Sequence, residues 1–182
     1  MLELALHILD IAENSTRAGA KNVGISVEED ESSDRIRLVI EDDGAGMSPE
    51  EAARALDPFF TTKKVRRVGL GLPMLAQAAE ATGGGLKLES MPGKGTRVSV
   101  EMGLTHIDRQ PLGDVPGALV ALIAGNPEIN ILYRHTRDGK EYHLDTAELK
   151  KELEDVPINH IEVLQYIRAH ISEGMEQIGS HA

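Results

Sequence analysis

The stretch Asp42-Asp43-Gly44-Ala45-Gly46-Met47 comes directly after a predicted strand, residues 35–41, in which apolar side chains alternate with polar ones. Glycine lets the backbone approach a planar ring closely, and the carboxylate of Asp42 can accept a hydrogen bond from an adenine amino group. Guanine presents a carbonyl oxygen at that place, which a carboxylate would repel. The stretch therefore predicts an adenine-reading loop or, as the alternative, an ordinary tight turn.

Upstream, residues from Leu2 to about Arg17 form a predicted amphipathic helix with a narrow polar stripe. Asp10 and Asn14 are four residues apart on this stripe, so both side chains project from the same face. Mg²⁺ with its waters would suit the amide oxygen of Asn14, while Asp10 could orient or deprotonate a nucleophile. Arg17, one turn further on, is placed to reach a phosphate. The alternative is the polar edge of an ordinary amphipathic helix.

Downstream, Gly69-Leu70-Gly71-Leu72 precedes a helix that Pro73 helps to begin and that runs to about Thr82. Free amides at a helix N-terminus, together with glycines, can bind the anionic groups of a triphosphate. Four basic residues just before the glycines add positive charge; they are Lys63, Lys64, Arg66 and Arg67. A solvated surface run is the alternative for these four.

The other patterns of the first hundred residues predict an α/β sandwich. Ser48 and Pro49 begin a short helix, with serine as the N-cap and proline at the first helical position. The predicted strands are residues 22–29, 35–41, 86–90 and 96–102.

The remaining residues, from about Thr105, are predicted to form a small α+β unit. A helix over 115–124 follows its N-cap Asp114, and strands are predicted at 129–135 and 140–144. Capping-box patterns predict two final helices; they are Asp145 with Glu148 and Asn159 with Glu162.

Asp138-Gly139 is a strong two-residue hairpin signal between those two strands. If Arg137 pairs with Lys140 across the turn, His135 and His143 lie on opposite faces of the hairpin. We therefore expect no histidine metal site there.

Composition narrows the classes of function. The chain has 182 residues and a net charge of −11, is 41% hydrophobic and only 3% aromatic, and lacks cysteine. Acidic charge and few rings argue against a nucleic-acid partner, and the missing thiols exclude disulfides and thiolate metal sites. The longest apolar run, Ala118–Ala124, is far too short for a membrane span. We expect a soluble, cytoplasmic protein without a membrane or nucleic-acid partner.

Taken in order, these motifs resemble the GHKL superfamily of gyrase B, heat-shock chaperone ATPases, sensor histidine kinases and mismatch-repair ATPases. Residues 10–15, DIAENS, look like the N box of that family, and 42–47 are similar to its G1 box. Residues 57–63, DPFFTTK, look like the histidine-kinase F box, and 69–72 match the G2 box. Gly93–Thr96 is similar to the late glycine–threonine turn. The resemblance covers residues 3–102.

The resemblance implies a Bergerat-type α/β sandwich at residues 1–104, a mixed sheet with helices on one face, binding Mg-ATP beneath a lid at about 59–69. Residues 105–182 would form a C-terminal interaction or regulatory domain. Asp10 would be the catalytic base or water-orienting group, and Asn14 the magnesium ligand. The implied nucleotide contacts are Asn14, Arg17, Asp42, Gly44, Gly46, Met47, Lys63, Gly69, Leu70, Gly71, Leu72 and Thr96.

The sequence departs from the family pattern at Asp10, where gyrase-like members carry glutamate and histidine kinases usually asparagine. No dimerisation helix with a phospho-acceptor histidine is expected before the N box. We therefore expect a protein kinase that phosphorylates a partner in trans, on histidine or serine. The alternatives are an ATP-hydrolysing conformational switch, which would drive dimerisation or assembly, and a non-catalytic ATP-sensing module that binds a partner.

Overall fold

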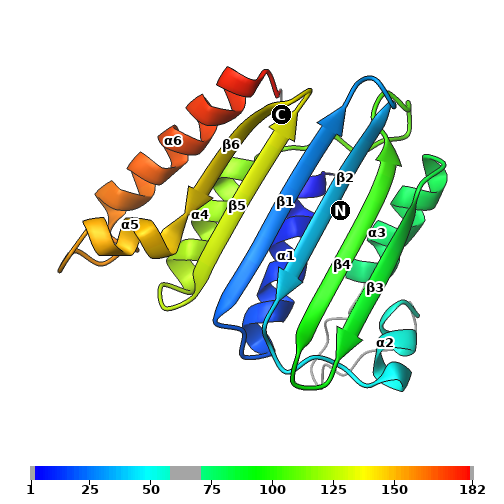
Figure 1. Ribbon diagram of the computed structural model, residues 1–182, viewed down its shortest axis with the longest axis horizontal. Helices are drawn as coiled ribbons and strands as arrows, with labels where there is room; N and C mark the ends of the chain where they lie inside the picture. The colour runs from blue at the N-terminus through cyan, green and yellow to red at the C-terminus, as the bar shows by residue number, and fades with distance from the viewer. Residues whose placement is uncertain (1–2, 58–70, 181–182) are drawn as a thin grey trace.

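The computed structural model describes residues 3–57 and 71–180. Six strands form one mixed sheet in the order β3-β4-β2-β1-β5-β6 (Figure 1). The strands are β1 (Asn22–Asp30), β2 (Arg35–Asp42), β3 (Gly85–Met91), β4 (Gly95–Gly103), β5 (Asn130–Arg137) and β6 (Lys140–Asp145). The helices are α1 (Leu4–Arg17), α2 (Pro49–Ala55), α3 (Gly71–Ala81), α4 (Val115–Gly125), α5 (Thr146–Glu152) and α6 (Ile161–Ile178). Strands β1 and β5 pair in parallel, and every other pair in this sheet is antiparallel.

Helices cover one face of the sheet, as expected for this class of sandwich. In Figure 1, α1, α3 and α4 lie behind the strands, and α6 lies beside β6. Apolar and polar side chains alternate along β1, so they point to opposite faces of the sheet. Val23, Ile25 and Val27 are buried on one face, whereas Glu28 is exposed on the other. The sheet therefore presents one apolar face to the helices and one polar face to solvent.

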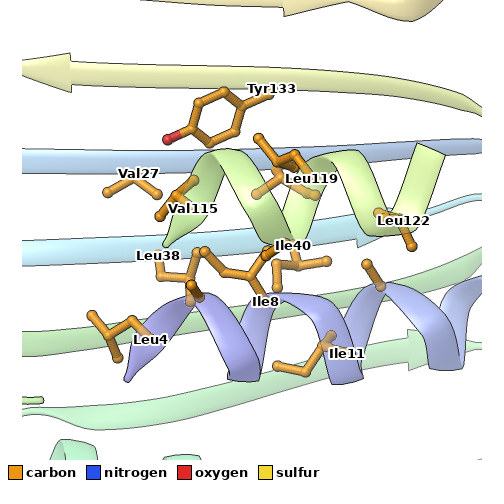
Figure 2. Close-up of a cluster of buried hydrophobic side chains, with 14 of the residues drawn as sticks. Leu4, Ile8, Ile11, Val27, Leu38, Ile40, Val115, Leu119, Leu122 and Tyr133 are labelled. Atoms are coloured by element: carbon orange, nitrogen blue, oxygen red, sulfur yellow. The ribbon is translucent and has the colours of Figure 1, made fainter. Parts of the chain in front are cut away.

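The core lies between that apolar face and the helices α1 and α4. Figure 2 shows side chains of both helices meeting those of the sheet. The labelled members are Leu4, Ile8, Ile11, Val27, Leu38, Ile40, Val115, Leu119, Leu122 and Tyr133. Because α1 packs here through its apolar stripe, its polar stripe is left at the edge of the core. Among the described residues, no helix is long and apolar enough to cross a membrane.

The C-terminal residues do not build a sheet of their own in the described structure. Strand β5 pairs with β1 along eight positions, from Asn22↔Asn130 to Glu29↔Arg137, and β6 continues the sheet beyond it. The physical reason is that the edge of β1 carries unpaired N–H and C=O groups, which β5 satisfies. Residues 105–182 thus extend the sandwich expected for residues 1–104, where the sequence patterns predicted a separate small unit.

The sequence correctly predicts the N-caps Ser48, Asp114 and Asp145, although not every helix end. Ser48 accepts a hydrogen bond from Glu51 N at 3.2 Å, and Ser48 N donates to Glu51 Oε2 at 2.8 Å, which completes a capping box. The prediction that Asn159 caps the last helix is wrong, because α6 has His160 as its N-cap and lacks a side-chain cap hydrogen bond.

Candidate functional site

The predicted site residues meet around a cavity of about 410 Å³ between α1, α2, α3 and the strands β2 and β4. Nine of the predicted residues line it: Asp10, Asn14, Arg17, Asp42, Gly46, Met47, Gly71, Leu72 and Thr96. Gly44 is not among the lining residues, although its amide contacts Asp42. The predicted contacts Lys63, Gly69 and Leu70 lie outside the described residues.

The carboxylate of Asp42 stands at the end of β2 and is held by two donors. Oδ2 accepts a hydrogen bond from Ser15 Oγ at 2.6 Å, and Oδ1 accepts one from Gly44 N at 2.8 Å. Ser15 is buried on α1, directly after Asn14, and the sequence interpretation missed it. The burial of its side chain, which the sequence does not show, distinguishes this serine from an ordinary polar residue of the helix surface. Asp42 is therefore oriented before any ligand arrives.

The glycine loop after β2 is clamped from two sides. Ala45 N donates to Ala18 O at 2.9 Å at the end of α1, and Gly93 N donates to Ala45 O at 2.7 Å from the β3–β4 turn. Gly46 has a φ of +65°, and a Cβ there would lie 2.0 Å from Met91 O. Only glycine fits this approach, which brings the loop against the end of β3.

Asp43, although adjacent to Asp42, fixes the start of β1. Its Oδ1 accepts hydrogen bonds from the amides of Lys21 and Asn22, and its Oδ2 from the side chain of Asn22 at 2.7 Å. The hydrogen bonds from Asn22 hold the pKa of Asp43 below its ordinary value. Two neighbouring carboxylates thus have different uses, and only Asp42 lines the cavity of about 410 Å³.

At the other end of the cavity, α1 presents its polar stripe to the start of α3. A Cβ on Gly71 would lie 1.8 Å from Asp10 Oδ2, so the carboxylate lies directly against this first residue of the helix. Asn14 Oδ1 accepts a hydrogen bond from the Arg17 guanidinium at 2.7 Å. The oxygen expected to bind Mg²⁺ therefore holds Arg17 in this structure.

The residues fit a magnesium nucleotide better than a metal bound by protein alone. Within residues 3–57 and 71–180, no cluster of three or more His, Cys, Asp or Glu side chains could hold a metal ion. One amide oxygen from Asn14 and a nearby carboxylate from Asp10 are hard ligands that suit Mg²⁺ when phosphates and water complete its shell. Because Gly71 has no side chain, the Asp10 carboxylate can lie against the N-terminus of α3.

The turn between β3 and β4 supplies a further polar contact. Ser90 Oγ lies 2.8 Å from Thr96 Oγ1, accepts a hydrogen bond from Met47 N at 2.8 Å, and lies 3.0 Å from Gly95 O. The sequence interpretation included Thr96 and missed Ser90. These bonds join the glycine loop to the strand that carries Thr96.

A covered mixed sheet, a helix with an acid and an amide, and a glycine loop beside a strand-end carboxylate define an ATPase-type nucleotide-binding fold. The profile of histidine kinase-, DNA gyrase B- and HSP90-like ATPases matches residues 2–106, and the chain belongs to that family.

Relatives and solved structures agree with this family. The chain is 36% identical over 89 residues to the sensor histidine kinase ZraS of Salmonella typhimurium, covering 48% of this chain and 19% of that protein. It is 35% identical over 110 residues to the sensor protein kinase CarS of Pseudomonas aeruginosa, covering 60% and 24%. The chain thus spans a quarter or less of these curated relatives. The Aquifex aeolicus MutL ATPase domain complexed with ADP shares the fold, with a TM-score of 0.52, 17% identity and coverage of 85% and 68%.

Proposed function

We propose that the protein binds Mg-ATP in this cavity and phosphorylates a partner protein in trans, on histidine or serine. One observation carries the proposal. The cavity is lined by an oriented acceptor, Asp42, by Asp10, which lies against the N-terminus of α3, and by Asn14 on the same helix as Asp10. This set of groups matches a nucleotide, which has a hydrogen-bond donor on its base and anionic charge on its phosphates.

At the base end, Asp42 would accept the amino group of adenine. Ser15 and Gly44 already bind one oxygen each, so the carboxylate keeps its orientation while lone pairs remain for the ligand. The backbone at Gly46 lines the same space.

At the phosphate end, Arg17 and the amides at the start of α3 would bind the anionic oxygens. Asn14 would hold Mg²⁺, whose charge, when bound, offsets the negative charge that develops on the transferred phosphoryl group. A serine acceptor or a water molecule must lose a proton, which Asp10 could take, whereas a neutral histidine nitrogen attacks with its own lone pair. Asp10 therefore supports serine or water as the nucleophile.

This last point favours one second candidate, an ATP-hydrolysing switch. A carboxylate at Asp10, beside the start of α3, is placed to activate water as readily as a hydroxyl side chain. We propose that residues 105–182 serve as the interaction or regulatory part in either case, because α5 and α6 lie apart from the residues that line the cavity.

The first experiment incubates the full chain with γ-labelled Mg-ATP, beside Asp10→Ala and the control Glu28→Ala on the exposed face of β1. Free phosphate, label on the protein and ATP binding are measured together. Phosphate release that Asp10→Ala reduces at least about tenfold, with Glu28→Ala unchanged, supports the ATP-hydrolysing switch. Saturable ATP binding without turnover supports transfer to a partner or ATP sensing. Absence of ATP binding overturns the proposed function.

A further inference from the structure

Ser90 joins three parts of the candidate site that are separate in the sequence. It lies near the end of β3, half-buried, and its hydroxyl contacts the glycine loop at Met47, the turn at Gly95 and the side chain of Thr96. Thr96 lines the cavity, whereas Ser90 does not. Ser90 therefore acts on a bound ligand only through its neighbours.

The hydrogen-bonding capacity of a serine hydroxyl decides the direction of each contact. A hydroxyl has one hydrogen to donate and two lone pairs that accept. Met47 N can only donate, so it uses one lone pair, and Gly95 O can only accept, so it takes the hydrogen, at 3.0 Å. The remaining contact, 2.8 Å to Thr96 Oγ1, must then use the second lone pair, with the threonine hydroxyl as the donor.

This direction determines what Thr96 can offer a ligand. Because the Thr96 hydroxyl donates its hydrogen to Ser90, its oxygen can only accept a hydrogen bond from a ligand in the cavity. Asp42 at the same end is an acceptor as well, with Ser15 Oγ and Gly44 N already donating to it. Two acceptors at one end of a cavity match an amino group that donates two hydrogens, and they disfavour a carbonyl oxygen at the same place.

We propose that Ser90 is a positioning residue for base selectivity: it fixes the Thr96 hydroxyl as an acceptor and thereby favours a purine that bears a 6-amino group. The inference rests on the proposed nucleotide site and deepens it. Without Ser90, the Thr96 hydroxyl is free to rotate and can donate as well as accept, so the distinction between an amino group and other substituents weakens.

The test compares two nucleotides on the full chain with Mg²⁺ present. ATP carries the 6-amino group, and purine riboside triphosphate carries hydrogen there. For Ser90→Ala we expect ATP affinity to fall about three- to tenfold, the usual value of one neutral hydrogen bond, while affinity for the second nucleotide changes less than about twofold. Equal weakening of both nucleotides would mean that Ser90 only holds the Met47 loop, and would overturn the inference.

Two further variants test whether Ser90 acts through the Thr96 hydroxyl. Thr96→Val removes the acceptor itself, so it should show the same ATP-specific loss, and Ser90→Ala added to it should have no further effect on the ratio of the two affinities. Ser90→Thr keeps a hydroxyl and should restore most of the ATP preference. Additive losses or an unrestored preference would contradict the inference.

Ser99→Ala is the matched control, because Ser99 lies on β4 with its side chain on the opposite face of the sheet from Thr96. It should leave both affinities unchanged. If the unaltered chain binds neither nucleotide, the proposed function fails and this inference fails with it. If the unaltered chain prefers ATP and Ser90→Ala keeps that preference, only the inference about Ser90 fails.

Discussion

Two carboxylates at opposite ends of the β1–β2 strand pair contrast a proposed ligand-binding group with a group that connects parts of the fold. Asp42 pairs with Val23 at the start of β1, while Glu29 lies near the other end. Asp42 is half-buried against a cavity and has two donors. Glu29 is only 5% exposed, and each of its two carboxylate oxygens contacts side chains of this chain.

The surroundings of Glu29 connect β1 to the end of the chain. Its Oε1 accepts hydrogen bonds from His135 Nε2 at 2.8 Å and from Ser180 Oγ at 2.6 Å, and Oε2 lies 3.5 Å from the Arg137 guanidinium. Tyr133 OH lies 2.7 Å from the other ring nitrogen of His135. The comparison teaches that spare hydrogen-bonding capacity beside a cavity, more than burial or charge, makes a carboxylate a candidate for ligand binding.

The largest expected effect is on the structural side of the comparison. Glu29→Ala leaves His135, Ser180 and Arg137 without their shared acceptor, so we expect the free energy of unfolding to fall by about 3–5 kcal/mol. Urea denaturation measures the loss, with Glu28→Ala, on the exposed face of β1, as the control that should stay within about 0.5 kcal/mol. ATP affinity of the folded variant should match that of the unaltered chain. A loss of ATP binding in folded protein would show that the two carboxylates are not independent.

A smaller effect, on binding rather than stability, is expected for Asp42→Asn. The amide removes the negative charge and places a donor against the donor of the base, so we expect ATP affinity to fall about a hundredfold or more, with little change in unfolding free energy. Calorimetric titration measures this. Asp43→Asn is the neighbouring control, and it should affect stability more than affinity because its partners lie at the start of β1. Unchanged affinity in Asp42→Asn would remove Asp42 from the base site.

The smallest effect concerns pH. Burial alone would raise the pKa of Glu29, but the hydrogen bonds from His135 and Ser180 and nearby positive charge outweigh it, so the pKa lies below its usual value of 4.5. A carboxyl with a lowered pKa contributes stability that is fully present above the usual value and is lost as pH falls through the folded value. We expect the unfolding free energy to decline as pH falls below about 4.5, and the decline to be shallower in Glu29→Gln. Parallel curves for the two proteins would contradict this assignment.

Local patterns predicted much of the fold. The helix over 71–82 is observed as α3 (Gly71–Ala81), and the predicted pairing of Arg137 with Lys140 is present, with Asp138 and Gly139 at φ values of +47° and +83°. Such features depend on residues that are neighbours in sequence, so periodicity and turn chemistry can reveal them. The same reasoning placed His135 and His143 on opposite faces, and the structure shows one buried and the other exposed.

Those local patterns did not predict contacts between residues that are far apart in the sequence. The parallel pairing of β1 with β5 joins residues 108 positions apart, such as Asn22 and Asn130, and alternation within a strand does not indicate its partner. Motifs in a fixed order identified most of the residues that share the cavity. Ser15 and Ser90 belong to no such motif, and the sequence interpretation missed them. Ser15 and Ser90 make hydroxyl contacts with residues outside their own helix or strand, and a single serine in a sequence does not indicate such contacts.

The pairing of β1 with β5 also has a consequence for how the chain is made. During synthesis from the N-terminus, β1 and β2 can pair as soon as both have emerged, but the other edge of β1 must wait until residues 130–137 leave the ribosome. In that interval an exposed strand edge with an apolar face is open to pairing with other chains. The sequence between β4 and β5, including the wholly apolar run Ala118–Ala124, therefore sets how long the nascent protein is vulnerable to aggregation.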